Sequence, residues 1–411
     1  RTKGVDIEVD VTEENPEMDS FEQMENGSIS FGDPSPPVDD TDFSANLADV
    51  MDDSDLNSVK NDLMGNVEDD KESRSDWEKT YREGLEYLGM KYEERSQPFE
   101  GASGVMHPLL AESVTQFQAQ AYNELLPSQG PVKTQVLGVT TPDTEGQASR
   151  VQEFMNYQLM QVMKEYDPET DQMLFYLPLS GSAFRKVYYD QNLGRAVSKF
   201  IPSEDLIVPY AATDLHSATR ITHVINMSMN DIRKSQQTGF YSDINIDSGN
   251  MMAEDVDGVQ EEIDELQGVS PSYKDDDMCK VHEIHTELDM PGFEDLNAEG
   301  EETGIKLPYI VTIGNDKILS IRRNYKENDP LKQRINYFVH YKFLPGLGFY
   351  GFGLTHMIGG LSKSATSILR QLIDAGTLSN LPAGFKARGI RIRNDDQPLQ
   401  PGEFRDMDAP G

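Results

Sequence analysis

Two glycine-containing segments carry the spacing that could bind a phosphate group. Gly346 to Gly351 (GLGFYG) fits the G-x-G-x-x-G pattern of dinucleotide-binding loops. However, Phe349 and Tyr350 stand where backbone amides would approach a pyrophosphate, and the chain that follows is helix-periodic instead of supplying a second strand with an acidic residue. We therefore interpret these glycines as a bend in the chain. A nucleotide-binding enzyme that uses the Gly346–Gly351 run is the alternative function.

The other candidate sites in the sequence match their motifs less well. Gly360 to Ser364 (GLSKS) lacks the Gly-Lys-Ser/Thr core of a P-loop, so we expect no ATP hydrolysis. Cys279, His282 and His285 have spacing compatible with zinc, but they lie in a predicted strand, where His282 and His285 point to opposite faces. No Ser/His/Asp or Cys/His constellation stands out in the sequence. We expect no metal, no cofactor and no enzymatic activity.

The densest basic cluster is near the end of the chain. It comprises Lys386, Arg388, Arg391 and Arg393. On an extended segment these side chains could contact DNA phosphates, which would confer no sequence specificity. They could equally be a solvated strand edge or form salt bridges to a neighbouring subunit. The sequence favours neither reading over the other.

A long amphipathic helix leads the chain to this basic cluster. An aromatic strand at 337–341 is followed by the glycines of the bend and then by apolar residues at intervals of four and three, which predict one helical face. From Leu354 to Ser379 the helix would be about 39 Å long, at ~1.5 Å per residue. The bend contains Gly346, Gly348, Gly351 and Gly353; the predicted face contains Leu354, Ile358, Leu361, Ala365, Ile368 and Leu372. Because Pro382 disfavours helix at the residue before it, the helix should end there, before a short strand with alternating Ile390, Arg391, Ile392 and Arg393.

The net charge of −36 is concentrated in two tracts. Residues 1–70 contain 21 acids and 3 bases, and residues 243–302 contain 20 acids and 2 bases, so each tract carries −18. We expect residues 1–74 to be disordered and residues 243–278 to be an exposed, flexible insertion. The tracts could be simply solvated, or they could repel DNA or recruit a basic partner. One cysteine suits a reducing compartment, and no apolar run approaches the ~18 residues of a membrane span.

Between the two tracts the pattern changes from helices to strands. A capping box at Ser75 and Glu78 should start the first helix, whose apolar stripe includes Trp77, Tyr81 and Leu85. The third helix should bury Val151 and Met155. We predict helices at 75–92, 108–127, 145–166, 168–176 and 229–237, and strands at 183–189, 195–201, 206–208, 221–225, 280–288, 310–313 and 318–322.

Several ordered blocks resemble the portal proteins of tailed bacteriophages, in particular a group found in short-tailed phages. The blocks cover roughly Ser75 to the end of the chain. Both their residues and their order along the chain match this family. The blocks are RVQE (150–153), GSAFRKV (181–187), DLIVPY (205–210), FYGFG (349–353), LPAGFK (381–386) and PGEF (401–404). This resemblance implies an α+β, portal-type fold with a mixed α+β wing at 75–352, a first stem helix at 353–380 and the start of a small β clip at 381–411. It also implies a returning stem helix, a tunnel loop and a crown, which this sequence lacks, so we expect the C-terminal part to be missing.

The resemblance further implies a ring, usually of twelve subunits, at one vertex of the capsid. The large subunit of terminase packages double-stranded DNA through the ring without sequence specificity, and head-tail adaptor proteins then dock there before ejection into the tail. The major capsid or scaffolding protein is a further expected partner, and no membrane is involved. The protein would be found in the virion, and in the host cytoplasm during assembly. In such a ring, Lys363 and Arg370 on the long helix join the basic cluster as candidates for DNA or inter-subunit contacts.

Overall fold

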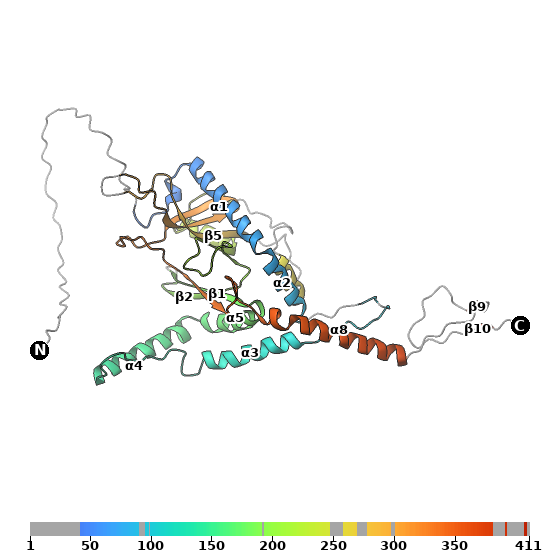
Figure 1. The fold of residues 1–411 in the computed structure, drawn as a ribbon. Coiled ribbons are helices and arrows are strands. Elements are labelled where there is room, and N and C mark those ends of the chain that lie inside the picture. The colour runs from blue at the N-terminus through green and yellow to red at the C-terminus, as the bar shows by residue number, and fades with distance from the viewer. Residues whose placement is uncertain are drawn as a thin grey trace, which may run out of the picture. The chain divides into compact units, whose positions relative to one another are not determined.

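The computed structural model describes residues 42–89, 95–97, 99–190, 193–246, 258–268, 278–296, 301–380, 391–392 and 407–408. All of them belong to one compact unit, Thr41–Gly411. This unit is a mixed α+β structure (Figure 1). None of the helices in its described residues is both long and apolar enough to cross a bilayer. The α-helices are α1 (Asp53–Ser73), α2 (Ser75–Glu86), α3 (Leu109–Leu125), α4 (Pro142–Tyr157), α5 (Tyr166–Ser180), α6 (Met229–Gln237), α7 (Gly258–Gln267) and α8 (Leu354–Asn380).

The strands form two larger antiparallel sheets and one short pair. One sheet has the order β2-β1-β8 and the other the order β3-β4-β5-β6-β7, while β9 pairs with β10. The strands are β1 (Ser182–Asp190), β2 (Arg195–Ile201), β3 (Leu206–Ile207), β4 (Arg220–Ser228), β5 (Met278–Leu288), β6 (Leu307–Gly314), β7 (Lys317–Arg323), β8 (Phe338–Lys342), β9 (Arg391–Ile392) and β10 (Met407–Asp408).

Local sequence explains most of these elements, and their predicted positions are confirmed to within a few residues. The predicted β1–β2 hairpin closes with a hydrogen bond from Gly194 N to Asp190 O, at 2.8 Å. In the β6–β7 hairpin, Asn315 and Asp316 both have positive φ, as a type I′ turn requires. Ser228 caps α6 by accepting a hydrogen bond from Asp231 N at 3.1 Å.

The prediction of disorder is wrong for residues 42–74. Helix α1 buries Leu63 and Val67 against the five-stranded sheet, together with Leu47 from the short 3₁₀ turn Leu47–Asp49. Acidic residues such as Glu68 and Asp69 remain exposed on the outer side of the helix. The apolar residues of α1 recur every three or four positions, and averaging composition over 74 residues concealed this periodicity. The folded α+β body therefore begins upstream of Ser75.

The expected start of the next helix is also different. No side chain caps α2, whose first residue is Ser75; the chain turns at Arg74 directly after α1. The predicted capping box is therefore wrong. The apolar stripe of this helix is confirmed, because Tyr81 and Leu85 are buried. It packs with α3, α5, α7 and the first turn of α8.

The second acidic tract contains an ordered helix. Val259 and Ile263 of α7 are buried beside Tyr81 and Leu85 of α2. The expectation of an exposed, flexible insertion at 243–278 is therefore wrong for residues 258–268. Val259 and Ile263 lie four positions apart and therefore share one face of α7. That face anchors this otherwise acidic helix in the core.

The third predicted helix does not bury its apolar stripe. Val151, Phe154 and Met155 of α4 are exposed, and only Met163, which follows a π-helical turn at Gln158–Val162, is buried. The helix packs mainly against the preceding chain segment, where Asn156 Oδ1 accepts a hydrogen bond from Val132 N at 2.9 Å. The amphipathic pattern of α4 is present, but among the described residues nothing covers its apolar face.

Candidate functional site

Glycine permits a close backbone contact at the start of α8. A Cβ on Gly351 would lie 2.4 Å from the carbonyl oxygen of Gly181, and a Cβ on Gly353 would lie 2.4 Å from that of Leu179. A Cβ on Gly346 would lie 2.8 Å from Tyr350 O, whereas at Gly348 nothing lies within 4 Å. Three of the four predicted bend glycines are therefore explained by close approach to other backbone atoms, and Gly348 is not.

Three amides at the end of this bend are already used within the chain. Gly351 N donates to Ser182 Oγ at 2.8 Å, Phe352 N donates to Leu344 O at 2.8 Å, and Gly353 N donates to His356 Nδ1 at 3.1 Å. A phosphate-binding loop needs such amides free and directed at the ligand. These three amides are therefore not available to a phosphate, and one of them, Gly351 N, belongs to the Gly346–Gly351 run.

The face of α8 that packs against its own chain is made of small and polar residues. They are Thr355, Gly359, Ser362, Thr366 and Asp374. Thr355 Oγ1 donates to Leu179 O at 2.9 Å, anchoring the helix to α5. Farther along, Thr366 Oγ1 accepts from His107 N at 3.0 Å and Asp374 Oδ1 accepts from Ser103 N at 2.7 Å, so the segment before α3 lies along the helix.

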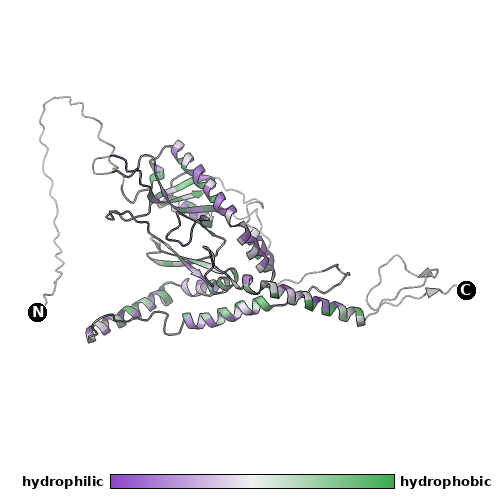
Figure 2. Ribbon diagram, in the orientation of Figure 1, coloured by the Kyte–Doolittle hydropathy of each residue, from purple (hydrophilic) through white to green (hydrophobic). Residues whose placement is uncertain are grey.

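The predicted apolar face of α8 is mostly uncovered. Leu354 and Ile358 pack partly against the helical core, and Ala365 is half-buried. Leu361, Ile368 and Leu372, which we call the apolar ridge, are 63%, 65% and 69% exposed. Each follows a buried residue by six positions, which is a rotation of roughly 120° around the helix. Figure 2 shows hydrophobic residues recurring along α8. The chain thus buries the polar face and leaves the apolar ridge exposed.

The predicted basic candidates have different surroundings. Arg370 Nε donates to Val105 O at 2.7 Å, and Lys363 Nζ lies 5.8 Å from the centre of the Tyr87 ring. A hydrogen bond with Tyr87 raises the pKa of Lys363. Both side chains therefore contact their own subunit. Arg391 lies in β9, as the predicted alternation suggested, while Lys386, Arg388 and Arg393 lie outside the described residues.

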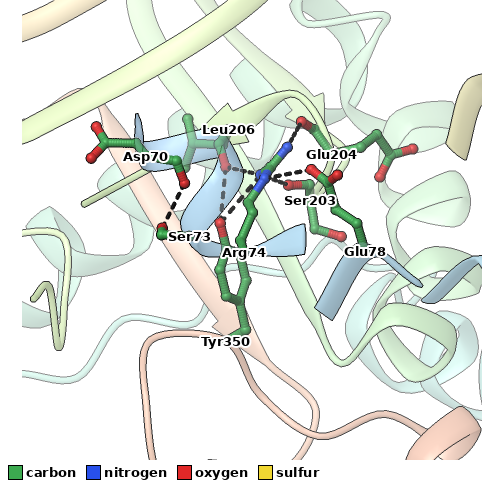
Figure 3. Close-up of polar contacts among 8 residues, drawn as sticks. All are labelled: Asp70, Ser73, Arg74, Glu78, Ser203, Glu204, Leu206 and Tyr350. Carbon is green, nitrogen blue, oxygen red and sulfur yellow. Dashed lines mark hydrogen bonds and ion pairs between the residues drawn. The ribbon is translucent and has the colours of Figure 1, made fainter. Parts of the chain in front are cut away.

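A buried arginine, Arg74, joins three segments of the chain (Figure 3). No sequence pattern predicted this role. Arg74 donates to Ser203 O at 3.0 Å and to Leu206 O at 2.9 Å, and it pairs with Glu78 at 2.7 Å. It also donates to the hydroxyl of Tyr350, at 3.2 Å, just before α8. The α1–α2 junction, the β2–β3 loop and the entry to α8 are thereby fixed together. An arginine between two surface-like helical segments has no distinctive sequence pattern.

A second buried polar cluster connects the two sheets. Nζ of Lys186 in β1 lies 2.5 Å from the carboxylate of Glu283 in β5. A hydrogen bond of 2.7 Å joins the same carboxylate to Nε2 of His285. Burial alone would raise the pKa of Glu283, but Lys186 and His285 hold it below its usual value. Burial lowers the pKa of His285 and, with Lys186 nearby, lowers that of His223 to about 3. The cluster is a structural link, and within the described residues no group of three His, Cys, Asp or Glu side chains could hold a metal ion.

No protein-family model matches the chain, and no curated protein matches it significantly.

Proposed function

We propose that this chain is a portal protein. In this proposal, copies of the chain form a ring at one capsid vertex, and α8 is the stem helix beside the channel. Terminase drives the genome through the ring, and head-tail adaptors later dock on the β9–β10 side, the proposed clip. The protein belongs to the virion and assembles in the host cytoplasm. The capsid or scaffolding protein surrounds the ring. The ordered sequence blocks described above support this proposal.

The single observation that carries the proposal is the exposed apolar ridge of α8. Leu361, Ile368 and Leu372 lie on one face of α8. The polar residues on another face of the same helix already tie it to its own chain. An uncovered apolar stripe of this kind marks a surface that binds another protein. A stem helix in a ring needs both features, because one side must hold the body of the subunit while another packs against the next copy.

The test is the oligomeric state of the full chain. We expect mass photometry and negative-stain images to show rings with a central hole. The double variant Ile368→Asp, Leu372→Asp should yield monomers, because two carboxylates would have to be buried without partners. Leu137→Asp is the matched control, since this residue is 89% exposed and lies between α3 and α4 in the chain.

The variants must also be folded for the result to count. The fluorescence of Trp77, the single tryptophan, reports its stacking on Tyr350, whose ring centre is 4.4 Å away. Both variants should keep the wild-type emission spectrum. A wild-type chain that stays monomeric, or a ridge variant that still forms normal rings, would contradict the proposal.

A further inference from the structure

A short segment between α2 and α3 lies along the second part of α8. We call residues 103–107 the clasp, and residues 361–380 of α8 the far half. Three hydrogen bonds join the backbone of the clasp to side chains of the far half: Ser103 N to Asp374 Oδ1 at 2.7 Å, Arg370 Nε to Val105 O at 2.7 Å, and His107 N to Thr366 Oγ1 at 3.0 Å. The numbers rise along the clasp as they fall along α8, so the two segments run antiparallel.

The spacing of these three bonds fits the geometry of both segments. On α8 the bonded side chains recur every four residues, which places them on one face of the helix and about 6 Å apart along it. On the clasp every second residue is bonded, and two residues of extended chain advance by about 6.6 Å. Because the clasp contributes backbone groups to all three bonds, α8 holds its main chain and not its side chains.

Hydrogen bonds, and not a packed core, make up much of this contact. A hollow of about 660 Å³ lies beside the far half, and its lining includes Tyr87, Met106 and the three α8 side chains that bind the clasp. Close-packed protein interiors leave no space of this size. Hydrogen bonds beside such a space open at a lower cost in free energy than bonds inside a packed core.

Two adjacent glycines separate the far half from the anchored first turn of α8. In that first turn, Thr355 Oγ1 donates to Leu179 O at 2.9 Å. A Cβ on Gly360 would have no atom of a neighbouring segment within 4 Å, and a Cβ on Gly359 would make an ordinary contact of 3.5 Å with the ring of Tyr87. Packing therefore does not require glycine at position 360. Glycine does lower helix stability, and sharp bends in helices occur at such residues.

We propose that Gly359 and Gly360 are a hinge and that the clasp is its lock. The far half then has two arrangements: held along the clasp, as the structure shows, or swung away about the glycine pair when the clasp opens. All three bonds lie on the same side of the hinge, so one bend moves all three α8 side chains together. Lys363, whose Nζ lies 5.8 Å from the centre of the Tyr87 ring, is exposed, and such a contact is weak enough to break as the helix bends. This device goes beyond the proposed function and does not depend on a ring.

Hydrogen exchange of the full chain, read at single residues by mass spectrometry, tests the lock. Thr366→Val removes the acceptor of His107 N while keeping the shape of the side chain. We expect the amides of residues 103 and 107, and those of the far half, to exchange about fivefold faster, which is the effect of one hydrogen bond on an opening equilibrium. Thr377→Val is the matched control and should change none of these rates, because Thr377 Oγ1 donates to Ile373 O of its own helix.

Two further variants test the lock from its other end and test the hinge. Asp374→Ala releases Ser103 N and should accelerate exchange over the same residues as Thr366→Val does. Gly360→Ala, added to the Thr366→Val chain, should return the far half toward its wild-type exchange rate, because alanine favours the helix and its Cβ meets no neighbouring segment.

The extent of the faster exchange decides the outcome. If Thr366→Val accelerates only the amide of residue 107, the lost bond acts locally and the inference is overturned. If Gly360→Ala leaves the exchange of the far half as fast as before, the glycine pair is not the hinge and the inference is also overturned. Neither result bears on whether the chain forms rings, so the proposed function is tested separately.

Discussion

At the scale of single residues, a buried arginine and a largely buried ion pair hold together segments that are distant in sequence. Arg74 donates to the buried carbonyl groups of Ser203 and Leu206. Lys186 and Glu283 link a strand of one sheet to a strand of the other. Such groups are costly to bury, so removing one partner has a large effect on stability.

Replacing Arg74 with leucine should therefore destabilise the fold. We expect Arg74→Leu to lower the free energy of unfolding by about 3 kcal/mol, because buried carbonyl oxygens and Glu78 lose their partner. Urea denaturation followed by Trp77 fluorescence measures the change. Arg150→Leu is the matched control on exposed α4, where surface substitutions change stability by less than about 0.5 kcal/mol. Equal effects of the two substitutions would argue against a structural role for Arg74.

Stability should also fall as the pH is lowered from 7 to 5. His223 has a folded-state pKa of about 3. The unfolded chain therefore takes up a proton on this residue below about pH 6.5, whereas the folded chain does not. The pKa of Glu283 is lowered in the folded chain, so this residue adds stability at every pH above the pKa that it has in the unfolded chain. Its contribution therefore does not change between pH 7 and pH 5. His285, whose pKa is also lowered, adds to the slope.

The variant His223→Phe should reduce this pH dependence. We expect the loss of stability between pH 7 and pH 5 to be smaller by about 2 kcal/mol, which is the proton-linkage contribution of one such histidine. Phenylalanine suits the site because within the described residues His223 Nδ1 makes no hydrogen bond, and the ring packs near Phe338. Urea titrations at several pH values give the slope. An identical slope in the variant and the wild type would show that His223 does not control it.

At the scale of elements, the connection between β8 and α8 is a tight backbone joint. Gly181, Gly351 and Gly353 bring the ends of α5 and of the bend within contact distance, and Thr355 adds a hydrogen bond to the same carbonyl region. The direction in which α8 leaves the body is fixed at this point. A ring contact made farther along α8 would depend on that direction.

Alanine substitutions at this joint should distinguish a closely packed glycine from one with open space around it. Gly353→Ala should lower the free energy of unfolding by about 2 kcal/mol or more, because its Cβ would overlap a backbone oxygen that cannot move freely. Gly348→Ala is the matched control and should change stability by less than about 0.5 kcal/mol, since nothing lies near that position. Thermal unfolding by circular dichroism compares them, and equal melting temperatures for the two variants would contradict the close contact.

At the scale of the whole molecule, two amphipathic helices expose their apolar faces. The chain covers its five-stranded sheet with α1 and its helical core with α2, α3, α5 and α7, but leaves the ridge of α8 and the apolar face of α4 open. Glu68 and Asp69 of α1 stay on the outside, whereas Asp70 is buried and pairs with Arg220. Exposed apolar stripes of this kind on a body with well-buried cores mark surfaces that bind other proteins.

The basic cluster supplies the prediction at this scale. If the proposed portal function holds, replacing Arg391 and Arg393 with glutamate should impair genome packaging or ring assembly, because charge reversal abolishes either phosphate contacts or salt bridges between copies. Phage yield measures packaging, and negative-stain imaging measures assembly. Wild-type yield together with normal rings would refute a role for these two arginines.

The sequence by itself determined where most helices and strands lie. The periodicity of Leu361, Ile368 and Leu372 predicts α8, because side-chain spacing follows directly from backbone geometry, and the aromatic run around Phe338 predicts β8. It did not determine what covers each face. Only the tertiary structure shows that α8 buries Thr366 and exposes Leu372, that α7 docks through Val259, and that Arg74 joins three segments. The reason is physical: spacing tells which side chains share a face, whereas burial depends on which distant segments arrive beside it.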